Sequence, residues 1–135
     1  GVDPYLIAST MNIAIAQRLV RKICSACKKE CALTEAEMKA LTGLPVQAPL
    51  GAKETISRGQ GCDACAGSGY KGRLCVNEVL VATPAIRDAI LRKAPADELR
   101  VIAIKEGMTT MLEDGFRKVR AGETTVEELL RVIHD

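Results

Sequence analysis

Two Cys-x-x-Cys pairs constrain this chain of 135 residues more than any other feature. The first pair is Cys24 and Cys27, and the second, after 34 intervening residues, is Cys62 and Cys65. Each pair can form a tight knuckle that directs two thiolates at one metal ion, and two knuckles complete a tetrahedral ligand set. The pattern therefore predicts a structural zinc site of four cysteines with no open coordination position.

Three other kinds of cysteine site compete with zinc. Six cysteines could form a disulfide framework, but no signal peptide or secreted composition accompanies them. A thioredoxin-like redox pair lies between a strand and a helix, whereas both pairs here adjoin stretches that we expect to be irregular. An iron–sulfur cluster also takes four cysteines, and the sequence alone leaves that alternative open.

Two cysteines and the single histidine fall outside this set. Cys31 follows Cys27 by four residues and could replace it as a ligand, and Cys75 lies in an apolar segment typical of a small buried side chain. Because the two pairs already fill a tetrahedral site, we expect neither Cys31 nor Cys75 to bind metal. His134 stands alone near the end of the chain, where we expect a solvated side chain.

The segment 24–70 differs in composition from the rest of the chain. It holds five of the six cysteines and six of the eleven glycines. Thr34-Glu35-Ala36-Glu37 predicts one capped helix that ends near Gly43, and prolines and glycines interrupt the remainder. With few apolar anchors, this segment is expected to be mostly irregular and to order through the metal. Alanine at Cys62 is then expected to unfold it while the C-terminal helices stay largely formed.

Regular structure is predicted on both sides of this segment, which gives an α+β fold class. Asp3 and Pro4 predict a helix over about 4–11. From Asn12 the apolar pattern permits either a buried strand or a continued helix, and we favour the strand, over about 13–23. A second strand is expected over about 73–81. Four helices that form one compact unit are expected over about 84–94, 96–106, 110–121 and 124–133, the last opened by a capping box at Thr124. Their expected core residues are Ile86, Ala89, Ile90, Leu99, Ile102, Ala103, Leu112, Phe116, Val119, Val126, Leu129, Leu130 and Ile133.

Charge and motif content limit the functions of this chain. Nineteen basic and seventeen acidic residues are mixed along it, and only three residues are aromatic, which argues against nucleic-acid binding. No phosphate loop or dinucleotide fingerprint occurs, and we expect the glycine-rich run 67–72 to form a tight turn. The longest uncharged run, 4–17, is shorter than a bilayer span. We assign no catalytic residue to the chain.

Several motifs, taken in order, resemble one family. They are Ala16-Gln17-Arg18-Leu19-Val20-Arg21, the two cysteine pairs, Gly69-Tyr70-Lys71-Gly72-Arg73, Glu78, Gly107-Met108, Asp114-Gly115 and Ala121-Gly122-Glu123-Thr124-Thr125-Val126-Glu127-Glu128. Together they resemble the C-terminal part of the bacterial type II secretion and type IV pilus assembly ATPases, over essentially the whole chain.

The resemblance implies a hexameric cytoplasmic motor, peripheral on the inner membrane, in which hydrolysis of ATP with Mg²⁺ drives pilus extension or secretion. The phosphate loop and catalytic carboxylates of these motors lie upstream of the matching segment, so this chain would be a structural or regulatory fragment. Its partners would be the upstream motor domain of the same chain, the other subunits of a homo-hexamer and an inner-membrane platform protein. Nucleotide-binding residues within the fragment are not assigned.

The resemblance also implies a division into three parts. Residues 1–23 would end a RecA-like ATPase core, 24–70 would be an inserted tetracysteine zinc module, and 71–135 would hold a returning strand and a C-terminal helical bundle. Cys24, Cys27, Cys62 and Cys65 match the metal ligands of the family residue for residue. Retraction-type relatives lack the module. Cys75 and Asn77 depart from the family pattern of glycine and a larger residue, which leaves the branch undecided.

Two alternatives come from other classes of protein. Cys62-Asp63-Ala64-Cys65-Ala66-Gly67-Ser68-Gly69 also resembles the Cys-x-x-Cys-x-Gly-x-Gly repeat of DnaJ-like chaperone zinc modules. Those domains carry four such repeats, and this chain has one. A nucleic-acid-binding zinc ribbon is the other alternative, and the weak net charge and scarce aromatics argue against it.

Overall fold

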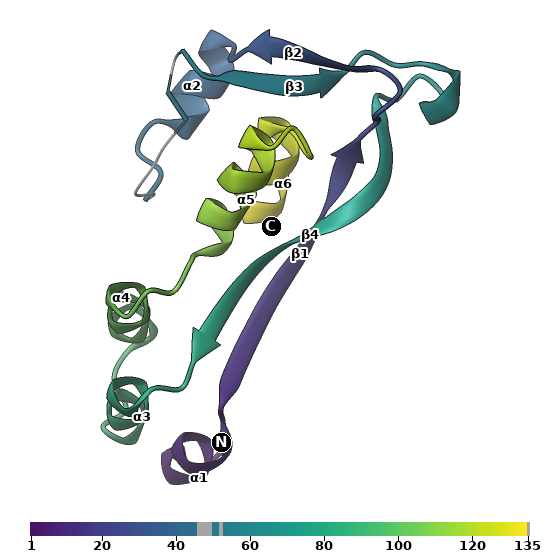
Figure 1. The fold of residues 1–135 in the computed structure, drawn as a ribbon. Coiled ribbons are helices and arrows are strands. Elements are labelled where there is room, and N and C mark those ends of the chain that lie inside the picture. Colours follow the sequence, from purple (N-terminus) through teal and green to yellow (C-terminus); the bar gives the residue numbers. More distant parts are fainter. Residues whose placement is uncertain (46–49, 52, 135) are drawn as a thin grey trace. The chain divides into compact units, whose positions relative to one another are not determined.

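The computed structural model describes residues 1–45, 50–51 and 53–134, in a mixed α/β arrangement (Figure 1). Within these residues, the helices and strands are, in order, α1 (Pro4–Thr10), β1 (Ile13–Ile23), β2 (Lys28–Ala32), α2 (Glu35–Leu41), β3 (Thr55–Gly59), the 3-10 turn η1 (Asp63–Cys65), β4 (Tyr70–Val81), α3 (Pro84–Leu91), α4 (Ala96–Lys105), α5 (Met111–Arg120) and α6 (Val126–His134). The strands lie between α1 and α3, and the helices α3 to α6 follow the last strand.

The long strands β1 and β4 pair with each other and run in opposite directions (Figure 1). Backbone hydrogen bonds continue the pairing past both ends of the strands. The amide of Ala82 donates to the carbonyl of Asn12, and the amide of Cys24 donates to the carbonyl of Gly69, each at 2.9 Å. Both predicted strands are thus confirmed, β4 beginning three residues before the expected Arg73.

The shorter strands β2 and β3 form a second antiparallel pair, in which Lys28 lies opposite Gly59 and Ala32 opposite Thr55. The expectation of a mostly irregular segment was therefore wrong here. Each strand has only five residues, and β2 is rich in charged residues. Neither therefore shows the alternation of apolar and polar residues that identifies a strand. Their pairing joins residues far apart in the sequence, which local patterns do not reveal.

Capping side chains begin the helices where the sequence indicates. Asp3 caps α1 and Thr83 caps α3, while Thr34 and Glu37 form the expected capping box on α2. These caps satisfy amide groups that have no partner within the first helical turn.

The N-cap of α6 lies one residue beyond Thr124, which the sequence predicts as part of a capping box with Glu127. Thr125 caps α6, because its hydroxyl accepts a hydrogen bond from the amide of Glu128 at 3.2 Å. The hydroxyl of Thr124 instead donates to the carbonyl of Arg21 at 2.8 Å. The local pattern assigns Thr124 to the cap, but in the structure this residue makes a long-range hydrogen bond instead.

The chain divides into two compact units. The first comprises 1–16 and 77–110, and the second comprises 17–76 and 111–135. We expected the four helices after residue 83 to form one compact helical unit, but α3 and α4 group with α1, whereas α5 and α6 group with β2 and β3. An apolar stripe shows that a helix face is buried but not what buries it. The three-part division at residues 23 and 70 stays a prediction.

In the first unit, α1 packs against α3, and α3 packs against α4. Of the expected core residues, Ile86, Ala89 and Ala103 are buried. Arg87 links α3 to α1 and to the residue after β4, because its guanidinium donates to the carbonyls of Ala8 and Ala82. No helix among the described residues is both long and apolar enough to cross a membrane.

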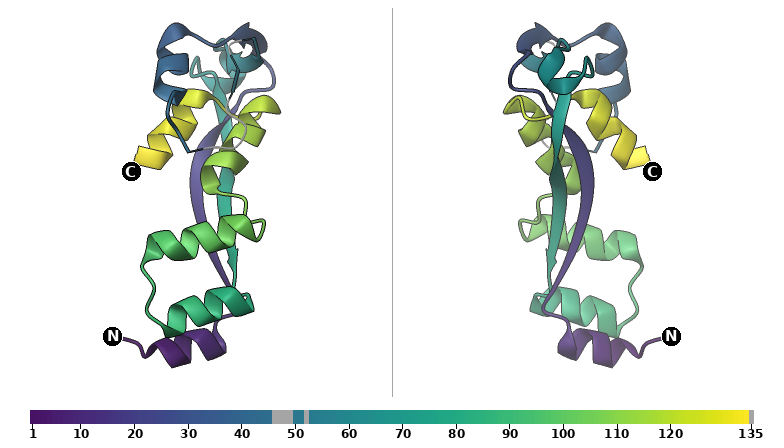
Figure 2. Two further views of the ribbon diagram at one scale, coloured as in Figure 1. Left: turned by 90° about the vertical axis from the view of Figure 1, so that its left-hand side faces the viewer. Right: turned by 90° about the vertical axis from the view of Figure 1, so that its right-hand side faces the viewer.

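The core of the second unit joins segment 24–70 to α5 and α6, which pack against each other (Figure 2). Its buried residues are Leu33, Leu41, Leu50, Ile56, Leu112, Phe116, Val119, Val126 and Leu129. Segment 24–70 thus contributes four apolar anchors, more than expected. They are too widely spaced in sequence to form a periodic pattern, but α5 brings a complementary apolar face to them.

Candidate metal centre

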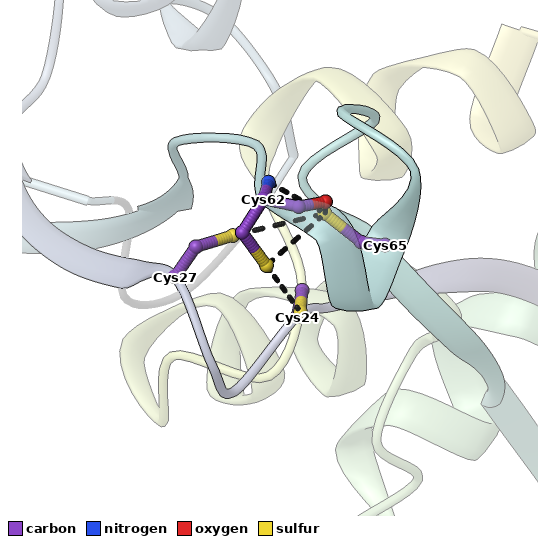
Figure 3. Close-up of side chains that lie close together, drawn as sticks. All are labelled: Cys24, Cys27, Cys62 and Cys65. Atoms are coloured by element: carbon purple, nitrogen blue, oxygen red, sulfur yellow. Dashed lines mark hydrogen bonds between the residues drawn. The ribbon is translucent and has the colours of Figure 1, made fainter.

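The structure brings together the four cysteines singled out by the sequence. Their Sγ atoms all lie within 4.8 Å of one another (Figure 3). The Sγ–Sγ distance is 3.9 Å from Cys24 to Cys62, 3.9 Å from Cys27 to Cys65 and 3.7 Å from Cys62 to Cys65. A tetrahedral zinc ion with Zn–S bonds of about 2.3 Å would place its sulfurs about 3.8 Å apart. The donor set therefore fits one four-coordinate ion.

Each pair is presented by a turn that the backbone closes. Cys24 directly follows β1 and Cys27 directly precedes β2, and the amide of Cys27 donates to the carbonyl of Cys24 at 3.3 Å. In the second knuckle, the carbonyl of Cys62 accepts from the amides of Cys65 at 3.1 Å and Gly67 at 2.9 Å. Both turns are thus formed by local backbone bonds, which aim the two side chains of each pair the same way.

Gly69 connects the two knuckles. Its amide donates to Sγ of Cys65 at 3.2 Å, and its carbonyl accepts from the amide of Cys24 at 2.9 Å. The backbone φ of Gly69 is +77°, in the region that favours glycine. Of the glycine-rich run 67–72, residues 67–69 therefore form the expected turn, whereas residues 70–72 begin β4. The turn also supplies a hydrogen bond to a candidate ligand.

Two further glycines allow the backbone to pass close to this turn. A Cβ added to Gly59 would lie 1.9 Å from the carbonyl oxygen of Gly69, and one added to Gly61 would lie 2.6 Å from that of Gly67. No side chain fits at either distance. Sequence reasoning missed this role, since the approach joins the end of β3 to the second knuckle and leaves no local signal.

The thiols of the cluster differ in acidity. Burial would raise the pKa of Cys65, but hydrogen bonds from the amides of Cys62 and Gly69 lower it to about 6. Burial raises the pKa of Cys27 to about 11. A divalent cation among the four sulfurs would favour the thiolate form of each, as metal ligation requires.

The distances between the sulfur atoms distinguish a site for one metal ion from a disulfide and from a four-iron cluster. All six cysteines are free thiols, and Sγ–Sγ distances of 3.7–3.9 Å are far longer than a disulfide bond of about 2.05 Å. A four-iron cluster places each cysteine on a different iron, which spreads the sulfurs more widely. The four sulfurs are therefore close enough together to hold a single metal ion.

The other residues considered lie apart from the cluster. Sγ of Cys31, on β2, accepts a hydrogen bond from Arg58 at 3.0 Å, and Cys75 lies half-buried in β4. Neither belongs to the group of four, and that they bind no metal stays a prediction. The side chain of His134 lies outside the described residues, so its exposure stays a prediction.

Comparison with known proteins places the chain in a family. The sequence profile of the family described as "Type II/IV secretion system protein" matches residues 1–131. The chain is 40% identical over 130 residues to the type IV pilus assembly ATPase PilB of Thermus thermophilus. It is 41% and 39% identical over 135 residues to the type II secretion system proteins E of Xanthomonas campestris and Pseudomonas aeruginosa.

These alignments cover 96–100% of the chain but only 14–26% of the length of each relative. The similarity therefore concerns one part of much longer proteins. The range that the family profile matches, residues 1–131, contains both cysteine pairs. The chain belongs to the type II/IV secretion system protein family.

Proposed function

We propose that this chain is the C-terminal part of an ATPase that powers type IV pilus assembly or type II protein secretion. The observation that carries the proposal is identity of about 40% over the whole chain to proteins bearing those names. In this proposal β1 and β4 form the edge of a RecA-like motor core, and residues 24–70 are an inserted module. ATP and Mg²⁺ are bound by the parent protein, and the fragment is structural or regulatory.

We further propose that Cys24, Cys27, Cys62 and Cys65 hold one structural Zn²⁺. Four thiolates fill the tetrahedral positions of zinc and leave none for substrate, and the sulfur spacing suits that geometry. The ion ties the turn between β1 and β2 to the turn before β4. Because such a site is not preformed in an unfolded chain, its binding energy adds to the stability of the fold.

Metal analysis of the purified chain tests the zinc proposal. We expect one zinc per chain, lost in Cys62→Ala and retained in Cys31→Ala and Cys75→Ala, whose sulfurs lie outside the cluster. The two retained variants control for the loss of a thiol as such. Iron in place of zinc, or no metal in the wild-type chain, would contradict the proposal.

The proposed partners are the upstream motor domain, the other subunits of a homo-hexamer and an inner-membrane platform protein. The proposed location is cytoplasmic, at the inner membrane through these partners. Introducing Cys62→Ala into the parent protein in cells is expected to reduce pilus assembly or secretion, with Cys75→Ala as the matched control. Normal assembly and secretion with Cys62→Ala, at normal protein level, would count against a role for the module.

A further inference from the structure

The turn between α5 and α6, residues 121–125, lies against the residues that flank the first knuckle. The amide of Ile23, directly before Cys24, donates to the carbonyl of Glu123 at 2.9 Å. Directly after Cys27, the ammonium group of Lys28 donates to the carbonyl of Gly122 at 3.3 Å. The α5–α6 turn therefore contacts the chain on both sides of this cysteine pair, from about 100 residues away in sequence.

A buried carboxylate strengthens this contact. Glu128, in the first turn of α6, is fully buried. Its oxygens accept hydrogen bonds from the backbone amide of Arg21 at 2.8 Å and from the Arg21 guanidinium at 2.7 and 2.9 Å. Arg131 also donates to it, at 3.1 and 3.3 Å. Charge-assisted bonds of this kind are stronger than neutral ones, and a buried carboxylate that loses them is costly.

Tyr70 extends the contact to the second knuckle. It follows Gly69, whose amide donates to Sγ of Cys65. The Arg21 guanidinium lies over the Tyr70 ring, 4.2 Å from its centre, and the Tyr70 hydroxyl is 2.9 Å from the hydroxyl of Thr125. Residues next to both cysteine pairs thus converge on the beginning of α6.

We propose that the α5–α6 turn and Glu128 are positioning elements of the metal centre, so that metal binding and the docking of α6 stabilise each other. The inference rests on the proposed function in requiring that the four cysteines bind an ion. The physical reason is linkage: if docked α6 holds the knuckles in the metal-binding geometry, the bound metal must favour docked α6 by the same factor.

One test measures this reciprocity in the full wild-type chain by hydrogen exchange, with zinc bound and after its removal by a chelator. We expect faster exchange without zinc at the amide of Ile23, which bonds to Glu123, and at that of Glu128, which bonds to Thr125. Unchanged exchange at both amides would overturn the proposal.

A second test measures the rate at which zinc passes from the chain to the chromogenic chelator 4-(2-pyridylazo)resorcinol. We expect Glu128→Gln to release zinc about tenfold faster, since one bond to a charged group contributes on the order of a factor of ten. Glu127→Gln, which removes the same charge from the exposed neighbouring residue, is expected to change the rate less than about twofold. Equal rates in the two variants would overturn the proposal.

Two further variants separate positioning from general stability. Ile86→Ala lowers stability in the other compact unit, where Ile86 is fully buried, and its zinc-release rate is compared with that of Glu128→Gln at an equal loss of melting temperature. If Ile86→Ala releases zinc as fast as Glu128→Gln, the effect of Glu128 is only a general loss of stability and the proposal fails. If Glu128→Gln does not fold, Tyr70→Phe decides, with Tyr5→Phe as its control: faster release in Tyr70→Phe alone supports the proposal, and equal rates overturn it.

The outcomes also separate this inference from the proposed function. A wild-type chain without zinc would overturn both. A chain that binds one zinc ion but whose release rate is the same in Glu128→Gln and Glu127→Gln would retain the metal proposal and overturn only the role of α6.

Discussion

Gly59 shows how one residue without a side chain can affect the geometry of the candidate metal centre. It ends β3, and its α-carbon passes so close to Gly69 that a Cβ would lie 1.9 Å from the Gly69 carbonyl oxygen. Gly69 in turn donates to Sγ of Cys65 and accepts from the amide of Cys24. The position of the second knuckle therefore depends on a residue that is not itself a ligand.

We expect Gly59→Ala to lower stability by about 1–3 kcal/mol, the usual cost of forcing extra volume into a packed site, and to weaken metal binding. Urea denaturation and metal titration measure the two effects. The matched control is Gly51→Ala, where the added Cβ meets no atom closer than 3.9 Å. Equal stability and metal affinity in the two variants would show that the backbone approach is unimportant.

Glu128 leads to a prediction about pH. Burial would raise the pKa of this carboxyl, but hydrogen bonds from Arg21 and Arg131 lower it to about 2. A carboxyl whose pKa is lowered by folding stabilises the native state fully above its unfolded pKa of about 4.3, and this stabilisation is lost as the pH falls towards the folded value.

The difference in unfolding free energy between wild type and Glu128→Gln is therefore expected to be constant above about pH 5 and to shrink between about pH 4.3 and 2. Urea denaturation at each pH measures it. Both proteins are compared without zinc, because the proposed coupling would otherwise make the loss of zinc at low pH contribute to the difference. A difference that stays constant down to about pH 2.5 would contradict the assigned pKa.

At the scale of elements, helices α5 and α6 pack closely at one point. Gly115, in the middle of α5, faces Leu129 of α6, and a Cβ at Gly115 would lie 2.1 Å from Leu129 Cδ1. Leu129 is fully buried, so its side chain has little room to move away. Glycine is a poor helix former, and its presence here is explained by the close approach of the second helix.

We expect Gly115→Ala to destabilise the chain by about 1–2 kcal/mol, because overpacking outweighs a gain in helix propensity of up to about 1 kcal/mol. Thermal denaturation of Gly115→Ala, Leu129→Val and the double variant measures the coupling. Gly115→Ala should lower the stability less in the Leu129→Val background than in the wild type. Additive effects would show that the two residues do not compete for space.

At the scale of the whole molecule, the shared core changes the expected unfolding behaviour. Sequence composition indicated that segment 24–70 would melt by itself when a ligand such as Cys62 is removed. In the structure, Leu33, Leu41, Leu50 and Ile56 of this segment pack with residues of α5 and α6. Elements that share one core tend to lose it together.

We now expect Cys62→Ala to lower hydrogen-exchange protection in β2, β3, α5 and α6 together, while α1, α3 and α4, which belong to the other compact unit, keep most of theirs. Cys75→Ala is the control, since its thiol lies outside the cluster. Loss of protection confined to β2 and β3 would show that segment 24–70 unfolds by itself. Equal loss of protection in all helices would show that the chain is one cooperative unit.

Features that depend on neighbouring residues could be predicted from the sequence. The caps of α1, α2 and α3 and the four-cysteine set are examples, because capping and knuckle spacing are local. The strand β1 was favoured, although its apolar pattern also permitted a continued helix. The sequence also predicted the buried stripe of α5.

Which surfaces meet could not be predicted from local sequence patterns and depends on the packed structure. It pairs β2 with β3, packs segment 24–70 on α5 and α6, places Gly59 against Gly69, and buries Glu128 beside Arg21. Each of these contacts joins residues that no helical or strand period relates. A local pattern shows that a face or a charge needs a partner, but the free energy of the whole packed unit selects that partner.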